Sequence, residues 1–423
     1  MFKNLFFNVG SKVLVIFSQF TALILTNHII GPEGRGIFLA VITWSNIFFV
    51  FFSLSLSTGI LNLANKNIQQ LNNLAYTSIL AAFVLGLGSM LAGIIFFKLA
   101  PGFFNKIGFI HLLITFSAIP FMLLQQYAMS VVQAKGNFRA FNVLYASYAS
   151  VNVLCIFIIW LLHKTSLELL IYINVFAWFI TGMFAIYYLW PFIKKKSNEF
   201  SVVKNLLRTS VVAHLGPIVS FILTRSDILI VNYFTNERQT GIYGLAIGIV
   251  QIVLILPLSL QNILYHKLMG KSLEEQKKIL LQFTRLTFTI VFVCVLAIWA
   301  FSKPLVYIIG GKNFAEAIPL LKYFLPGILF YSIPMVMAAQ WTLMGIFKQL
   351  NISSVVILII SVLSNIILIP KFGIIGGAIT FGITTIVLLL IYIWFFKKYL
   401  HKVNLAQLFL IQKSDIKMIL NKQ

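Results

Sequence analysis

The sequence predicts an all-α polytopic membrane protein of about twelve transmembrane helices, in two six-helix lobes with pseudo-two-fold symmetry. Three observations predict this fold: the apolar composition, the spacing of apolar stretches and an internal repeat. The 423 residues are 60% hydrophobic and 10% charged, whereas soluble proteins are about 45–50% apolar and about 25% charged. A mean hydropathy of +0.98 leaves too few polar side chains to cover a water-exposed surface. Soluble enzymes, disulfide-rich secreted modules and disordered chains are therefore excluded.

Apolar stretches of bilayer-spanning length, about 20 residues each, follow one another along the chain. They are residues 9–30, 36–61, 74–97, 109–133, 143–162, 168–190, 209–233, 241–265, 280–301, 316–345, 350–369 and 374–396. The first is too long for a signal peptide and lacks a small-residue cleavage site, so we expect it to remain as a span. The tenth carries Pro326 and Pro334, which predict a kink. The basic tail, 397–423, fits either an interfacial helix or a frayed end.

The charge distribution predicts the orientation of the spans. The chain has 32 Lys and Arg, nine Asp and Glu and a formal net charge of +23. Cytoplasmic loops of membrane proteins collect Lys and Arg, so we expect no nucleic-acid partner. With a cytoplasmic N-terminus, two cations fall inside spans, and those left on the outer side are Arg35, Lys98, Lys106, Lys164, Arg238, Lys303, Lys312 and Lys371. The rest lie inside, which predicts that both termini are cytoplasmic.

An internal repeat divides the chain into halves. The matched pairs are Gly36–Phe38 with Gly241–Tyr243, Gly136–Asn142 with Gly345–Asn351, and Pro120 with Pro326, at offsets of 205 to 209 residues. Offsets of about half the chain predict a duplicated six-helix unit whose copies have the same topology. The expected lobes are residues 1–200 and 201–396, with the tail, 397–423, on the cytoplasmic side.

Charged residues inside the spans are the candidate site residues, because a charge at the centre of a membrane helix costs roughly 2.5–3.5 kcal/mol. Arg225 and Asp227 lie in the seventh span, with Arg225 expected in its outer half. Their side chains point about 200° apart, so they do not pair well with each other. Lys322 and Lys12 lie near span ends, where each either faces a cavity or extends to the membrane interface.

Backbone and catalytic motifs complete the sequence-based expectations. Gly216 and Pro217 remove a helical hydrogen bond in the seventh span and are a candidate hinge. Gly270-Lys271-Ser272 lacks the earlier glycine of a phosphate-binding loop, since Tyr265 stands there. The two cysteines and six histidines have no metal-ligand spacing. We therefore expect no metal, no cofactor and no enzymatic activity, and a transporter driven by a gradient.

Four glycine-rich or charged motifs resemble one family over essentially the whole chain. They are Gly31–Phe38, Arg225-Ser226-Asp227, Gly241-Ile242-Tyr243 and Gly373–Ala378. Together they resemble the bacterial polysaccharide-biosynthesis flippases, the O-antigen and capsule repeat-unit exporters of the multidrug/oligosaccharidyl-lipid/polysaccharide superfamily.

The resemblance implies a function. Such a protein has two six-helix lobes around a central cavity, and it moves a polyprenyl-diphosphate-linked oligosaccharide across the bacterial inner membrane by alternating access. Arg225, Lys322 and Lys12 are the positions implied to bind the diphosphate, and Asp227 is implied to couple to an ion or to organise the lobes. The implied partners are the lipid-linked oligosaccharide, membrane lipids and the polysaccharide polymerase and glycosyltransferases of the same pathway.

Three alternatives stay open. A peptidoglycan-precursor flippase of the same superfamily usually has two more spans and a longer chain. A drug exporter of that superfamily is expected to carry more acids inside the membrane than Asp227 alone. A polytopic polymerase or ligase of the same pathway needs a large outer loop with an acid and a histidine, and the outer connections at 98–108 and 302–315 are short.

Overall fold

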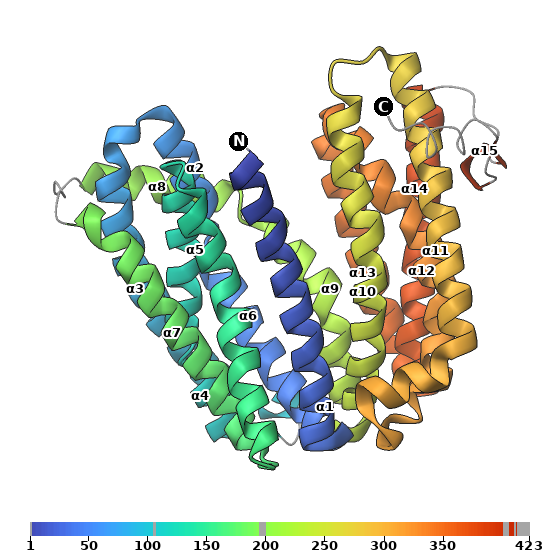
Figure 1. Ribbon diagram of the computed structural model, residues 1–423, viewed down its shortest axis with the longest axis horizontal. Coiled ribbons are helices and arrows are strands. Elements are labelled where there is room, and N and C mark those ends of the chain that lie inside the picture. Colours follow the sequence, from blue (N-terminus) through green and yellow to red (C-terminus); the bar gives the residue numbers. More distant parts are fainter. Residues whose placement is uncertain (1, 105–106, 194–199, 401–405, 410–411, 413–423) are drawn as a thin grey trace. The chain divides into compact units, whose positions relative to one another are not determined.

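The computed structural model describes residues 2–104, 107–193, 200–400, 406–409 and 412, and all regular structure in this part of the chain is helical (Figure 1). The α-helices are α1 (Phe2–Phe52), α2 (Leu56–Lys66), α3 (Leu71–Leu99), α4 (Phe109–Phe116), α5 (Ile119–Ala134), α6 (Phe138–Leu161), α7 (Leu167–Ile193), α8 (Phe200–Val212), α9 (Leu215–Phe234), α10 (Glu237–Leu268), α11 (Leu273–Gly310), α12 (Ala317–Leu343), α13 (Phe347–Phe372), α14 (Ile374–Leu400) and α15 (Ala406–Phe409). Short 3-10 helices are η1 (Ile68–Gln70), η2 (Pro101–Phe104) and η3 (Lys312–Phe314).

The predicted all-α membrane fold is confirmed. Eleven helical runs in the described chain are long and apolar enough to cross a membrane. The first, Gly10–Lys66, has 57 residues. At about 1.5 Å per residue such a run is long enough to cross a hydrocarbon core of about 30 Å twice. The run therefore accounts for both the first and the second predicted spans.

The two halves of α1 meet at Gly31. Its φ of 63° and ψ of −172° fall outside the helical region, in a conformation that suits glycine. Pro32 follows at once and begins the second half, where its fixed φ and missing N–H suit the first helical position. The chain turns back at this point (Figure 1). The sequence predicted a connection over residues 31–35, but a single glycine makes the turn.

The described chain divides into two compact units, Met1–Gly241 and Ile242–Gln423. The predicted lobes, 1–200 and 201–396, stay a prediction. In the described structure α8 packs on α2 and α9 packs on α1, so both helices belong to the first compact unit. The Lys194–Lys196 run lies outside the described residues, as does most of the predicted tail; of that tail, only residues 397–400, α15 and Gln412 are described.

The core of the first unit is aromatic and lies between α1, α3, α4 and α5. Trp44 contacts Phe104 with tilted rings whose centroids are 4.7 Å apart, and the ring centroids of Phe48 and Phe116 are 5.1 Å apart. Tyr127 is fully buried, and its hydroxyl donates to the backbone oxygen of Ser53 at 2.9 Å. That bond satisfies a carbonyl at the break between α1 and α2, where Leu54 and Ser55 have positive φ.

His214 joins two helix breaks. It lies between α8 and α9 and is 7% exposed. Its Nε2 is 2.9 Å from the backbone oxygen of Phe51, and its Nδ1 is 3.1 Å from Ser55 Oγ. Since a carbonyl only accepts, Nε2 is the donor to Phe51, and Nδ1 forms the hydrogen bond with the serine hydroxyl. The break between α1 and α2 is thus held to the break between α8 and α9.

The second unit is built around α12, which packs on α11 and on α14. Trp341 of α12 is fully buried and makes edge-on contacts with Tyr392, Phe395 and Phe396 of α14. The helix continues through Pro326 and Pro334 without a non-helical residue.

A non-helical residue appears instead in α11. Phe301, with φ of −103° and ψ of 17°, precedes Pro304 by three residues. A proline removes a hydrogen bond from the preceding turn, which accounts for this position.

Two glycines predicted as a repeat pair contact each other's helices. A side chain added at Gly36 would meet the backbone oxygen of Glu237, and one added at Gly241 would meet the backbone oxygen of Pro32. Each contact is with the residue four positions before the other glycine. Gly36 and Gly241 are 205 residues apart, and so are Pro32 and Glu237, which matches the offset of the sequence repeat.

Candidate functional site

A polar cavity of about 280 Å³ lies inside the first unit, between the two halves of α1 and helices α6 and α7. In both halves of α1 and in α6, the lining residues recur about once per helical turn, so one face of each of these segments lines the cavity. The lining residues are Ser18, Gln19, Ala22, Leu23, Thr26, Arg35, Phe38, Leu39, Ile42, Tyr148, Ala149, Asn152, Ile156 and Asn174. Its volume corresponds to that of roughly nine water molecules. Half of these side chains are polar, in a unit whose helices are otherwise apolar.

Arg35 is the one charged residue of this lining, which we call the Arg35 cavity. Its Nη1 donates to Thr26 Oγ1 at 3.3 Å, and its guanidinium carbon lies 5.8 Å from the centre of the Phe38 ring. Its Nε is buried and has no hydrogen-bond partner in the described structure. A guanidinium has five N–H donors, so this group has donors left for an acceptor in the cavity.

The opposite wall is a fixed polar group. Asn174 Nδ2 donates to the hydroxyl of Tyr148 at 2.6 Å, and Asn174 is 5% exposed. The Tyr148 ring stacks on Trp178 with centroids 4.0 Å apart and an angle of 15°. This packing fixes the tyrosine, so its hydroxyl and the Asn152 amide stay directed at the cavity as hydrogen-bonding groups for a polar ligand.

The electrostatics of the Arg35 cavity favour an anion. None of its lining residues is acidic, and Glu33, the carboxylate nearest to Arg35 in the sequence, is exposed and outside the lining. A cation in a membrane protein attracts negative groups strongly because the surroundings have a low dielectric constant. The cavity therefore suits a phosphate or carboxylate and disfavours a cation.

The sequence placed Arg35 in an outer loop, and this was wrong. Arg35 belongs to the second half of α1, because Gly31 alone makes the turn. A usable signal was present: Ser18 and Thr26 in the first span, and Tyr148 and Asn152 in the fifth, repeat at helical spacing within apolar runs.

Arg225 and Asp227 lie in α9, and neither lines the Arg35 cavity. Arg225 is half-buried and stands at the middle of a 20-residue helix, since α9 begins at Leu215 and not at residue 209. Its expected place in the outer half of the span stays a prediction. Asp227 accepts from the backbone N–H of Ile228 at 2.9 Å. Their predicted roles in substrate binding and ion coupling stay predictions.

Lys322 and Lys12 also lie outside the Arg35 cavity. Lys322 is exposed near the start of α12, with its ammonium 5.4 Å from the centre of the Trp299 ring. Trp299 is 58% exposed, so the pair is an outward-facing Lys–Trp contact of the kind found at membrane interfaces. Lys12 is exposed on α1. Their predicted contact with substrate stays a prediction.

Gly216 and Pro217 stand in the first turn of α9, at the beginning of the candidate span Leu215–Phe234. The N–H groups of a first turn have no partner within the helix, so Pro217 removes no helical hydrogen bond there. The break in this part of the chain lies at Ala213 and His214. The hinge role of Gly216 and Pro217 stays a prediction. The loss of a helical hydrogen bond, from which it was inferred, does not occur at this position.

An acid and a histidine meet at the ends of α4 and α7. His111 Nε2 lies 3.8 Å from Glu168 Oε1, and Ser166 Oγ donates to Glu168 Oε2 at 2.7 Å. Ser166 Oγ also accepts from the backbone N–H of Leu169 at 3.3 Å, which is a helix-capping contact. Glu168 is 57% exposed and bonded to the serine, so this arrangement caps α7 and does not activate Ser166 as a nucleophile.

No protein-family model matches the chain, and no curated protein matches it in sequence. Solved structures do match. A multidrug resistance MATE family transporter of the MOP superfamily, in its inward-facing conformation, has 14% identity and a TM-score of 0.75, over 91% of this chain and 94% of that one. The lipid II flippase MurJ, in an inward closed conformation, has 15% identity and a TM-score of 0.77, over 96% of this chain and 89% of that one.

A third match is a MOP superfamily transporter from Pyrococcus furiosus, described as having a binding pocket of reverse polarity. It has 13% identity and a TM-score of 0.57, over 93% of this chain and 94% of that one. At these identities the likeness establishes the fold alone. The chain therefore has the fold of the MOP-superfamily transporters.

Proposed function

We propose that the chain is a flippase that moves a polyprenyl-diphosphate-linked oligosaccharide across the bacterial inner membrane by alternating access. The observation that carries the proposal is Arg35, a cation with unused donors in a polar cavity without a carboxylate. A diphosphate and a sugar do not cross hydrocarbon unaided, because each charge and hydroxyl loses its hydration. Arg35 supplies the opposite charge, and Tyr148, Asn152 and Gln19 supply hydrogen bonds suited to sugar hydroxyls or phosphate oxygens.

The fold likeness supports transport in general, since similar structures include one named as a lipid II flippase and one named as a multidrug transporter. The polarity of the Arg35 cavity favours the first kind of substrate. An exporter of cationic drugs needs a carboxylate to offset the charge of its substrate, and the cavity offers a guanidinium. The proposal places glycosyltransferases and a polymerase before and after this step in the pathway.

Reconstituted vesicles test the proposal. The purified chain is incorporated with a polyprenyl-diphosphate-linked disaccharide, and appearance of the sugar at the outer surface is measured with a lectin. We expect Arg35→Ala to lower the rate at least tenfold, since a hydrogen bond to a charged group contributes about 1.5–3 kcal/mol. Arg35→Lys keeps the charge and should retain part of the rate. Arg139→Ala removes an exposed arginine outside the cavity and is the matched control.

Two results would overturn the proposal. One is equal lectin signal from wild-type vesicles and from vesicles without protein, combined with extrusion of ethidium, which identifies a cation exporter. The other concerns cells that carry His111→Ala. If the lipid-linked precursor still appears at the outer surface but polysaccharide assembly is lost, the protein is the polymerase or ligase. A flippase tolerates His111→Ala, because His111 only meets a helix cap.

A further inference from the structure

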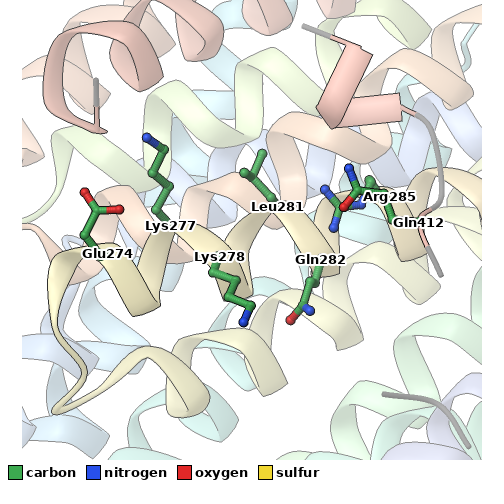
Figure 2. A pocket seen from close by; sticks show the side chains of 7 residues that line it. All are labelled: Glu274, Lys277, Lys278, Leu281, Gln282, Arg285 and Gln412. Atoms are coloured by element: carbon green, nitrogen blue, oxygen red, sulfur yellow. The ribbon is translucent and has the colours of Figure 1, made fainter. Parts of the chain in front are cut away.

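A second cavity, of about 260 Å³, lies in the other unit along the first turns of α11. Its lining is Glu274, Lys277, Lys278, Leu281, Gln282, Arg285 and Gln412. Figure 2 shows Glu274 at one end, Arg285 with Gln412 at the other, and both lysines between them. Residues of α11 three or four positions apart share a helix face, so these side chains form one stripe. We call it the α11 basic pocket.

The α11 basic pocket has three cations and one acid in its lining. The second nearby acid, Glu275, is held in the capping box of α11, where its Oε2 accepts from the backbone N–H and the hydroxyl of Ser272 at 3.0 Å each. Glu275 is therefore held at the helix cap and does not line the pocket. Arg285 is 4% exposed and forms the floor of the stripe, so a guanidinium is fixed at the inner end of the pocket.

The pocket has a defined depth relative to the membrane. After Arg285, α11 has no charged residue until Lys303. The uncharged segment, 286–302, is about 26 Å long at about 1.5 Å per residue, close to the hydrocarbon thickness of about 30 Å. Arg285 therefore marks the hydrocarbon boundary. Lys277 and Lys278 lie about 11 Å further out, where the phosphates of lipid headgroups are found.

The C-terminal segment closes one side of the pocket. Phe409 of α15 contacts Phe288 of α11 edge-on, with ring centroids 5.2 Å apart, and Leu408 is 1% exposed. This packing places Gln412 at the pocket, next to Arg285 in the lining. The site is thus an open pocket lined by residues from two parts of the chain.

We infer that the α11 basic pocket binds the phosphate of an anionic phospholipid. The lipid belongs to the membrane leaflet next to Lys277 and Lys278. Lys277 and Lys278 offset the negative charge, and the amide of Gln282 donates to phosphate or glycerol oxygens. Glu274 limits the affinity by repulsion at the outer end. This inference does not depend on the transported substrate.

Lysine footprinting of the full chain tests it. The protein is placed in nanodiscs of phosphatidylglycerol or of phosphatidylcholine, and acetylation of each lysine is followed by mass spectrometry. We expect Lys277 and Lys278 to be acetylated at least fivefold more slowly in the anionic lipid, while Lys271 and Lys348, exposed and outside the pocket, change less than twofold. Equal protection of all four lysines would mean diffuse attraction only and would overturn the site.

Matched variants separate the pocket from general charge. Lys277→Gln/Lys278→Gln should weaken phosphatidylglycerol binding in native mass spectrometry about 25-fold, since each cation near an anionic surface contributes a factor of about five. Lys271→Gln/Lys348→Gln removes the same charge outside the pocket and should change binding less than twofold in moderate salt. Glu274→Gln should strengthen binding. Equal losses from the two double variants would contradict the inference.

A soluble ligand is the other source of the same phosphate chemistry. Glycerol 3-phosphate is therefore titrated with the protein in phosphatidylcholine nanodiscs. Protection of Lys277 and Lys278 by this soluble phosphate, without any by phosphatidylglycerol, would overturn the lipid assignment. Protection by the lipid alone supports it.

Discussion

The charged side chain of Arg225 makes an unfavourable contribution to the free energy of membrane insertion of α9. It lies at the middle of α9, where a charged side chain costs roughly 2.5–3.5 kcal/mol. A membrane helix that carries such a residue at its centre normally directs it to water, a ligand or a partner group. This makes Arg225 a stronger candidate for substrate contact than Lys12 or Lys322, which lie near helix ends.

The corresponding prediction concerns transport without loss of the protein. Arg225→Ala should abolish transport of the lipid-linked oligosaccharide, while Arg225→Lys retains part of it because the positive charge stays. Surface polysaccharide in cells that lack their own flippase is the measurement, with membrane levels determined by immunoblot. Arg208→Ala, which removes an exposed arginine from α8, should leave transport unchanged. Wild-type polysaccharide from cells with Arg225→Ala would rule out the role.

At the scale of single helices, hydropathy predicted where the chain crosses the membrane but not where its helices break. The stretches 74–97 and 350–369 correspond to α3 and α13, because a lipid-facing helix needs apolar side chains over its whole length. The break between α1 and α2 is stabilised by Tyr127 and His214, which are distant in sequence. Such contacts leave no periodic signal, so the sequence joined α2 to the second span.

The same limit explains the candidate site. The polar residues that line the Arg35 cavity were visible in the sequence, but their meeting depends on α1 turning back at Gly31 and on α6 and α7 packing beside it. Arg35 was assigned to a loop because a five-residue connection had been expected at 31–35. Its place in a helix follows from one backbone angle that hydropathy does not report.

The contact between Gly36 and Gly241 gives a prediction about the helices that carry them. An added methyl group at either position meets a backbone carbonyl, so α1 and α10 must separate. Gly36→Ala and Gly241→Ala should each lower the free energy of unfolding by about 1–3 kcal/mol. The double variant should cost less than their sum, because both changes act at one contact. Thermal unfolding in detergent, followed by tryptophan fluorescence, measures this.

Gly382→Ala is the control, since nothing lies within 4 Å of the added carbon in α14. It should stabilise slightly, because alanine is favoured over glycine inside a helix. Unchanged melting of Gly36→Ala would show that the helices do not approach closely at this point.

At the scale of the whole molecule, the repeat constrains orientation. Copies of a unit with an even number of spans have the same direction through the membrane. Helices α3 and α11 correspond to the third and ninth predicted spans, which are equivalent under the repeat. They must therefore run in the same direction, and this holds whatever the arrangement of the units.

Lysines that flank α3 and α11 allow a test of whether the two helices cross the membrane in the same direction. Lys66, the last residue of α2, precedes α3, and Lys98 lies at the other end of α3; Lys271 precedes α11 and Lys312 follows it, and all four are exposed. In a background with Cys155→Ala and Cys294→Ala, each is replaced singly by cysteine and treated with an impermeant maleimide on intact cells. Lys98→Cys and Lys312→Cys should be labelled, whereas Lys66→Cys and Lys271→Cys should need permeabilised membranes. Labelling of Lys98→Cys and Lys312→Cys from opposite sides of the membrane would refute the duplication. If only Lys66→Cys and Lys271→Cys were labelled on intact cells, the duplication would stand and the predicted orientation would be reversed.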